Sequence, residues 1–136
     1  MIDHSQHVSA ISLVILEVDL SIIRLPADVA VPEWALRGAF FSITRAVGEL
    51  SVVCDSRHVP TGSVQIEAGW RGLAVVGPLD FALTGVMSAI AGALAGAAVS
   101  IFAISTFDTD YVLVKSDKLE DAVKALRGAG MRVTKD

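Results

Sequence analysis

Residues 77–114, GPLDFALTGVMSAIAGALAGAAVSIFAISTFDTDYVLV, decide which folds are open to this chain. They include 27 consecutive residues without a charge, Phe81–Phe107, a length that would suffice for a membrane-spanning helix. The run changes character half-way. Residues 85–98, GVMSAIAGALAGAA, favour a helix, whereas 99–106, VSIFAIST, are rich in β-branched and aromatic residues and favour a strand. We therefore expect a buried helix followed by a buried strand.

The flanks of this run argue against a membrane span. Asp80 precedes it, and Asp108 and Asp110 follow it, so neither end carries the Lys or Arg that anchors a spanning helix. The first residues, MIDHSQHVSAI, lack the basic segment of a secretory signal. The expectation is a soluble, cytoplasmic protein with no membrane partner.

Composition narrows the functional classes. The chain has 136 residues, 53% of them hydrophobic and 19% charged, and a net charge of −4. This length fits one compact domain or two very small ones, and the hydrophobic content excludes disorder. A single cysteine excludes a disulfide scaffold. Eleven Lys and Arg against fifteen Asp and Glu lack the basic excess of a nucleic-acid binder.

The C-terminal half, 69–136, predicts one complete α+β domain. Thr84 is the expected N-cap of its first helix, and Gly128 and Gly130 are typical of the end of its second. The order β-α-β-β-α-β is the ferredoxin-like arrangement, an antiparallel sheet with helices on one face. The expected strands are 73–76, 99–106, 111–114 and 131–133, and the expected helices 85–98 and 119–129. The apolar stripe of the first helix is expected to be Val86, Ile90, Leu94 and Ala97.

The N-terminal half, 10–68, predicts an abbreviated copy of the same fold. Residues 41–53 can be laid on 103–114 with Thr44 on Thr106, an offset of about 61–62 residues with one extra residue in the first hairpin. The connections are short and rich in proline, which leaves no room for two full helices. The expected strands are 11–16 and 20–25 with a turn at 17–19 between them, then a hairpin of 40–45 with 50–54, and one helical turn at 33–37.

The stretch 77–114, and above all the string ISTFDTDY, strongly resembles ACT domains. The upstream pieces RLP, FFSITR and ELSVVC extend the resemblance to nearly the whole chain from about residue 13. It looks most like the small bacterial tandem ACT-domain proteins that are related to the cytosolic arginine sensors of the CASTOR type. The resemblance implies sheets that pair side by side, no cofactor, and regulation by a bound amino acid or similar small ligand where two units meet. Because an open strand edge is a liability, we also expect a homodimer. It implies no catalysis.

The resemblance also implies a set of ligand-binding residues. In the arginine sensors a Thr-Phe-x-x-Asp string contacts the ligand, and Thr106, Phe107 and Asp110 match it position by position. Gly85 matches the glycine at the start of the first ACT helix. Asp110 would hold the cationic end of the ligand, and Phe107 would shield it. The ligand carboxylate would be held at the start of the helix and the end of the strand, by Thr84, Gly85, Val86, Ser105 and Thr106.

One difference from the arginine sensors and one alternative role for Asp110 weaken a direct copy of their site. The acidic contact on the first helix has no counterpart, because Met87 and Ser88 occupy that region, so arginine selectivity does not carry over. Taken by itself, Asp110 is also typical of a turn aspartate that bonds nearby backbone N–H groups. A ligand-free module that dimerises or docks on a partner is therefore the alternative to a sensor.

Other chemistry finds little support in the sequence. Asp108 and Asp110 on one turn, or His4 and His7 near the N-terminus, lack the further ligands that a metal site needs. Cys54 ends an apolar strand and is typical of an inert buried thiol. An acyl-phosphate hydrolase on this fold would need an arginine in the loop 77–84, which contains none. We expect no metal and no enzymatic activity.

Overall fold

The computed structural model describes residues 11–62, 65–77 and 83–135. It divides into two compact units, each described here by itself. Unit 1 consists of the described residues up to Glu17 together with those from Arg71 onward, and unit 2 is Val18–Trp70. The sequence placed 10–17 with the N-terminal copy. The structure groups the described residues 11–17 with unit 1, because the first half of strand β1 (Ser12–Leu25) pairs with the last strand of the chain.

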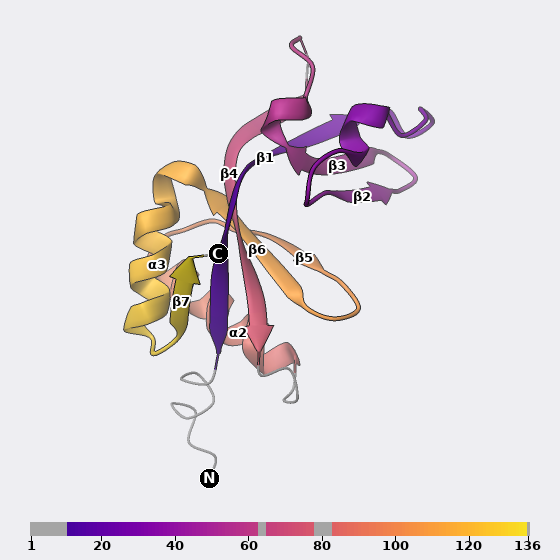
Figure 1. The fold of residues 1–136 in the computed structure, drawn as a ribbon. Helices are drawn as coiled ribbons and strands as arrows, with labels where there is room; N and C mark the ends of the chain where they lie inside the picture. The colour runs from indigo at the N-terminus through magenta and orange to yellow at the C-terminus, as the bar shows by residue number, and fades with distance from the viewer. Residues whose placement is uncertain (1–10, 63–64, 78–82, 136) are drawn as a thin grey trace. The chain divides into compact units, whose positions relative to one another are not determined.

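Unit 1 has the predicted ferredoxin-like order (Figure 1). Its elements are the later part of β4 (Ile66–Gly77), α2 (Leu83–Gly96), β5 (Phe102–Ser105), β6 (Asp110–Lys115), the 3-10 turn η3 (Ser116–Lys118), α3 (Leu119–Gly128) and β7 (Arg132–Lys135). Its strands lie in the order β7-β1-β4-β6-β5. The first half of β1 (Ser12–Leu25) is thus an extra strand between β4 and β7, parallel to β7 with Leu13 opposite Val133.

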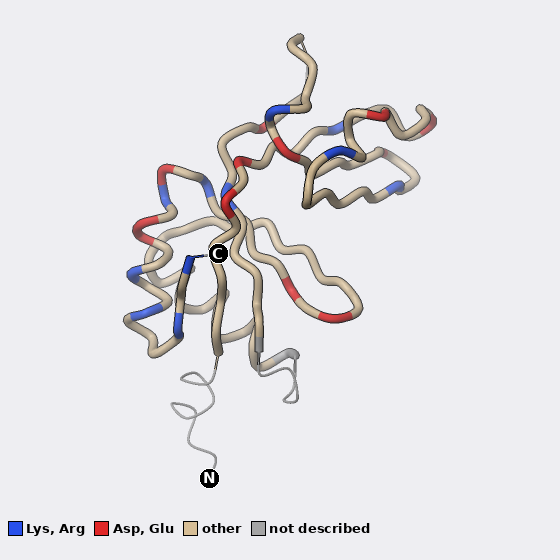
Figure 2. The backbone as a smooth tube through the Cα atoms, in the orientation of Figure 1, with Lys and Arg blue, Asp and Glu red and all other residues tan. Residues whose placement is uncertain are grey.

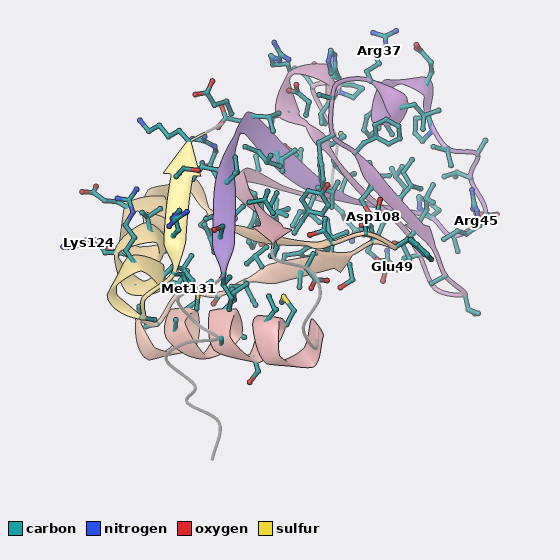
Figure 3. All side chains as sticks on the ribbon, turned by 60° about the horizontal axis from the view of Figure 1, so that its bottom comes forward. Arg37, Arg45, Glu49, Asp108, Lys124 and Met131 are labelled. Atoms are coloured by element: carbon teal, nitrogen blue, oxygen red, sulfur yellow. The ribbon has the colours of Figure 1, made fainter. Side chains whose placement is uncertain are left out.

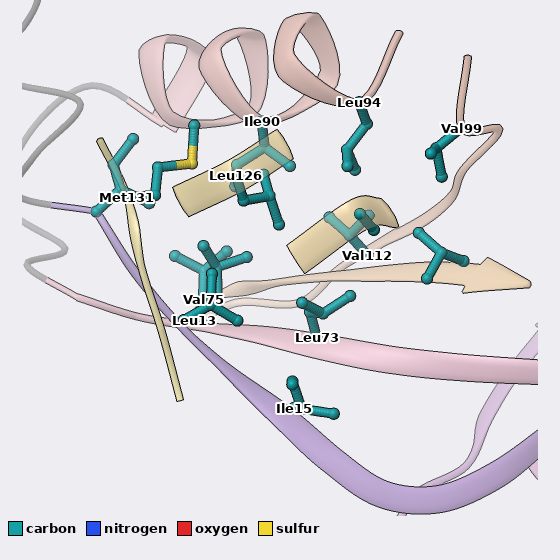
Figure 4. Packing of buried hydrophobic residues seen from close by; sticks show 14 of the residues in the cluster. Leu13, Ile15, Leu73, Val75, Ile90, Leu94, Val99, Val112, Leu126 and Met131 are labelled. Atoms are coloured by element: carbon teal, nitrogen blue, oxygen red, sulfur yellow. The ribbon is translucent and has the colours of Figure 1, made fainter. Parts of the chain in front are cut away.

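The core of unit 1 lies between the sheet and its two helices (Figure 4). Three of the four residues predicted for the apolar stripe of α2 are buried in it, namely Val86, Ile90 and Leu94, whereas Ala97 is exposed. From α3 it receives Ala122 and Leu126. The sheet contributes Leu13, Ile15, Leu73, Val75, Val112, Val114 and Val133. Burial of this apolar surface is the main stabilising contribution to the unit.

Both helices of unit 1 end in the same hydrogen-bonded motif. At the end of α2, Val99 N donates to Leu94 O at 2.9 Å and Ala98 N to Ala95 O at 3.0 Å. At the end of α3 the same two bonds involve Met131, Leu126, Gly130 and Arg127, each at 3.0 Å. This is the Schellman motif, whose penultimate residue adopts a left-handed conformation. Gly130 supplies it in α3 with φ +98°, but Ala98 supplies it in α2 with φ +59°.

Unit 2 contains short strands and 3-10 turns, and no α-helix among its described residues. Its elements are the second half of β1, η1 (Glu33–Leu36), β2 (Ser42–Arg45), β3 (Leu50–Asp55), η2 (Ser56–His58) and the start of β4. β3 pairs antiparallel with both β1 and β2. A small core of Ile23, Ala35, Leu50, Val52 and Cys54 holds the unit together.

Two expectations about the N-terminal half are corrected. The turn predicted at 17–19 does not exist, because β1 continues through these residues without a break. Glu17 and Asp19 lie two positions apart in the strand, and both are exposed. The hairpin of β2 and β3 has no extra residue. It closes at Arg45 opposite Leu50, and the β5–β6 hairpin closes at Ser105 opposite Asp110. The structural repeat therefore has an offset of 60 residues, not 61–62.

Candidate functional site

The candidate site lies at the closed end of the β5–β6 hairpin in unit 1. The turn is held by a bond from Thr106 N to Thr109 O at 2.8 Å, and Thr109 N donates back to the Thr106 hydroxyl at 3.2 Å. The hydroxyl of Thr109 donates to the carbonyl of Val75, which ties the turn to β4, the strand that leads toward α2. Asp108 lies in this turn and is exposed (Figure 3). The hairpin end is thus a fixed platform of hydroxyls and carboxylates.

Asp110 is the buried acid of this platform. Only 5% of the residue is exposed, and its Oδ1 accepts a hydrogen bond from the Ser105 hydroxyl at 2.6 Å. Ser105 itself is exposed. Within the described part of the chain no Lys, Arg or His lies at ion-pair distance from Asp110. A buried carboxylate is costly unless a positive charge or several donors compensate it.

Unit 2 shows how a buried aspartate is usually compensated. Asp55, 2% exposed, accepts hydrogen bonds from the backbone N–H of Arg57 at 2.9 Å and from its guanidinium at 2.7 Å. These hydrogen bonds with Arg57 lower the pKa of Asp55, although burial alone would raise it. Sequence reasoning missed this pair, for which the only signal was an acid at a strand end two residues before an arginine. Asp110 has no such cationic partner among the described residues.

The structure brings together only part of the expected residue set. Ser105 and Asp110 are in contact, and Thr106 uses its hydroxyl within the same turn. Phe107 is fully exposed, so its ring covers nothing in the described structure.

The expected residues at the start of α2 have different environments. Gly85 is exposed in the first turn of the helix, where backbone N–H groups lack intrahelical acceptors. Val86 packs its side chain into the core, so only its backbone is available to a ligand. Thr84 is the second residue of α2 rather than the residue before it, and its side chain lies outside the described part of the structure.

Other reactive groups do not form a site in the described residues. The buried thiol of Cys54 has its pKa raised to about 11, first by burial and then by the charge of Asp55. No group of three metal-ligating side chains occurs in the part of the chain that the structure describes. His4 and His7 lie outside that part. None of the described helices is long and apolar enough to cross a membrane.

Solved structures of other proteins share this architecture. A protein of Agobacterium tumefaciens is 38% identical, covers 93% of this chain and 94% of its own, and superposes with a TM-score of 0.88. A Vibrio cholerae protein, titled a possible transport protein, is 16% identical over 90% of this chain and 92% of its own, with a TM-score of 0.73. The regulatory subunit of aspartate kinase from Thermus thermophilus is 12% identical over 86% of this chain and 96% of its own, with a TM-score of 0.58. These last two show the fold alone.

Sequence comparison agrees with the structural match. The bovine cytosolic arginine sensor for mTORC1 subunit 1 (Bos taurus) is 32% identical over 96 residues, 65% of this chain, and the chain spans only 29% of that sensor's length. A family model of an N-terminal domain matches residues 19–62. A second family model, described as an ACT domain, matches residues 65–128, which include all of α2, β5, β6 and α3. The chain therefore belongs to the family of ACT-domain proteins.

Proposed function

We propose that this chain is a sensor that binds an amino acid or a similar zwitterion at the β5–β6 hairpin end of unit 1. The observation that carries the proposal is the carboxylate of Asp110, which is buried and oriented by Ser105 but has no described cationic partner. A ligand ammonium or guanidinium would supply the missing charge through a charge-assisted hydrogen bond. The arginine sensors that this chain resembles support an amino-acid ligand.

The rest of the zwitterion requires donors for its carboxylate. The backbone N–H groups around Gly85 are of the right kind, since helix N-termini favour anions, whereas the single proton of the Ser105 hydroxyl is already donated to Asp110. Thr84 would add a hydroxyl donor, whereas the Thr106 hydroxyl donates to the carbonyl of Thr109 and would have to break that bond to reach the ligand. Phe107, exposed in the free protein, would close over the bound ligand and lose its contact with water. Binding at this site is regulatory and requires no cofactor or metal.

A thermal-shift panel of the common amino acids tests this proposal. A ligand that binds only the native state stabilises it and so raises the melting temperature. At a hundredfold excess over its Kd, the unfolding free energy rises by about 2.7 kcal/mol. The Asp110→Asn variant should lose the shift, because it keeps the shape of the side chain but not its charge. The matched control is Asp108→Asn, which removes an exposed acid from the same turn. A flat panel at millimolar ligand, with both variants folded, would rule out the sensor.

A second candidate, a dimerising interaction module, is favoured by the edge strand β5. β5 ends the strand order of unit 1, and residues 97–107 around it carry no charge. Natural edge strands usually carry charges or proline that prevent pairing with another chain. We expect this edge and Phe107 to contact a second copy, giving a homodimer. Light scattering after gel filtration should show twice the chain mass for the native protein and a monomer for Ile104→Lys; a native monomer at high concentration would exclude this candidate.

A further inference from the structure

A separate surface of unit 1 is rich in positive charge. Residues 124–135 contain four cations and no acid, in a chain whose net charge is −4. The four are Lys124 and Arg127 on α3 and Arg132 and Lys135 on β7, and we call them the basic edge. All four are exposed, and they gather where the end of α3 lies beside β7 (Figure 2; Lys124 is labelled in Figure 3).

The charges of the basic edge are not neutralised within the described chain. None of its four residues lies at ion-pair distance from a described carboxylate. Part of this charge has a local explanation, since cations near a helix C-terminus interact favourably with its dipole. That explanation does not extend to Arg132 and Lys135 on the strand. Such a surface is complementary in charge to an acidic partner.

The backbone of β7 offers hydrogen-bonding groups on the same surface. Arg132 N donates to Ile11 O at 3.0 Å, so this residue directs its backbone toward β1. Successive residues of a strand direct their backbone groups to opposite sides, which places the N–H and C=O groups of Val133 and Lys135 on the outer side of β7. The outward carbonyl of Val133 accepts a hydrogen bond from the Arg127 guanidinium at 2.7 Å. In the free chain, Arg127 thus closes part of an open sheet edge.

We propose that the basic edge binds an extended acidic segment of a partner protein, which adds to the sheet as a strand beside β7. The carboxylates of the segment would bind Arg127 and break its hydrogen bond to the carbonyl of Val133. A backbone N–H of the segment would then donate to that carbonyl in place of Arg127. Strand addition obtains affinity from such main-chain bonds and specificity from the side chains along the edge. A peptide fits this surface better than a nucleic acid, because only a polypeptide supplies the alternating N–H and C=O groups that can pair with the outer side of β7.

Two labelled peptides of equal charge test the proposal on the full chain by fluorescence anisotropy. One alternates Glu and Val and can form a strand; the other repeats Glu-Pro-Pro, so that its prolines fall on both edges of the extended chain and remove most backbone donors on either side. We expect the Glu-Val peptide to bind at least about tenfold more tightly, with affinity that falls as salt rises. Equal affinity for the two peptides would overturn strand addition. Tighter binding of a duplex DNA of similar charge would overturn the choice of a protein partner.

Variants at Lys135 separate charge from backbone. Lys135→Ala removes one exposed cation, and we expect it to weaken binding of the Glu-Val peptide about two- to fivefold. Lys135→Pro removes the same charge and also the outward N–H, so its loss should be clearly larger. Arg37→Ala is the matched control, since Arg37 is exposed on unit 2 and ion-paired with Glu33 at 2.7 Å. If Lys135→Pro binds as well as Lys135→Ala, or if Arg37→Ala weakens binding equally, the proposal is wrong.

Discussion

Replacing Ala98 by glycine should stabilise this protein. Ala98 closes α2 with φ +59°, a left-handed conformation that brings its Cβ close to the backbone. For a residue with a side chain this conformation costs about 1–2 kcal/mol. Glycine avoids that cost but loses about 0.5–1 kcal/mol more conformational entropy when the chain folds. Because Ala98 is exposed, no packing is lost, and the net gain in unfolding free energy should be about 0.5–1 kcal/mol.

Two further variants calibrate this expectation within the same unit. Ala97 is also exposed at the end of α2 but does not have a positive φ, so Ala97→Gly incurs the entropic cost without relieving strain and should destabilise. Gly130 occupies in α3 the position that Ala98 occupies in α2, with φ +98°. Gly130→Ala should therefore lower the unfolding free energy by about 1 kcal/mol.

Urea and thermal unfolding followed by circular dichroism measure all three variants. For a chain of this size a change of 1 kcal/mol moves the melting temperature by roughly 2–4 °C. Ala98→Gly should melt above the native protein, and both Ala97→Gly and Gly130→Ala below it. If Ala98→Gly is destabilised as much as Ala97→Gly, the left-handed conformation of Ala98 is not a source of strain and the reasoning fails.

Three other measurements follow from the packing and charges of the two units. Arg57→Ala leaves the buried Asp55 without its cation and should lower the unfolding free energy at pH 7. Because the native pKa of Asp55 is lowered, this loss should persist above pH 3.8 and vanish as the pH falls through the native pKa. Acid unfolding of the native protein and the variant, compared across this pH range, measures the effect. Ile90→Ala empties a fully buried site and should cost about 2–5 kcal/mol in urea unfolding, a value that a loss below 0.5 kcal/mol would contradict. With its pKa at about 11, Cys54 should resist a thiol reagent at pH 8 until urea unfolds the chain, so rapid labelling of folded protein would show that the thiol is accessible.

The elements that the sequence predicted well have a strong hydrophobic period. The stripe of α2 was predicted because Val86, Ile90 and Leu94 recur at helical spacing, and they are all buried in the core. The continuous apolar run of β6 and the amphipathic pattern of α3 were signals of similar strength. The ferredoxin-like order followed from these elements together with the turn residues between them.

The elements that were misjudged depend on backbone geometry or on distant contacts. The strand predicted from residue 99 begins only at Phe102, because Ala98 and Val99 are used in the Schellman motif of α2. The sequence repeat matches Thr44 with Thr106 by side chain. In the structure the two turns correspond by their closing hydrogen bonds, which are Ala46 N to Glu49 O at 2.9 Å and Thr106 N to Thr109 O at 2.8 Å. A one-residue shift of register cannot be recognised from composition alone.

The candidate site was predictable in part for the same reason. Ser105 and Asp110 are neighbours because a four-residue turn places them opposite each other, which the sequence pattern of a hairpin indicates. That Asp110 is buried without a described cation, whereas Asp55 has Arg57, depends on how each hairpin packs on its neighbours. The exposure of Phe107 likewise has no signature in the sequence.

The two halves of β1 give the chain an unusual order of assembly. Ser12–Ile15 of β1 pair with Arg132–Lys135 of β7. This side of the unit 1 sheet can therefore form only after residues 132–135 have been synthesised. During synthesis on a ribosome, unit 2 emerges whole while unit 1 still lacks its C-terminal strand. Contacts between such distant segments slow folding. A fragment cut to the matched ACT-domain range, 65–128, would lack both strands at that side of the sheet, and studies of the isolated domain should keep both ends of the chain.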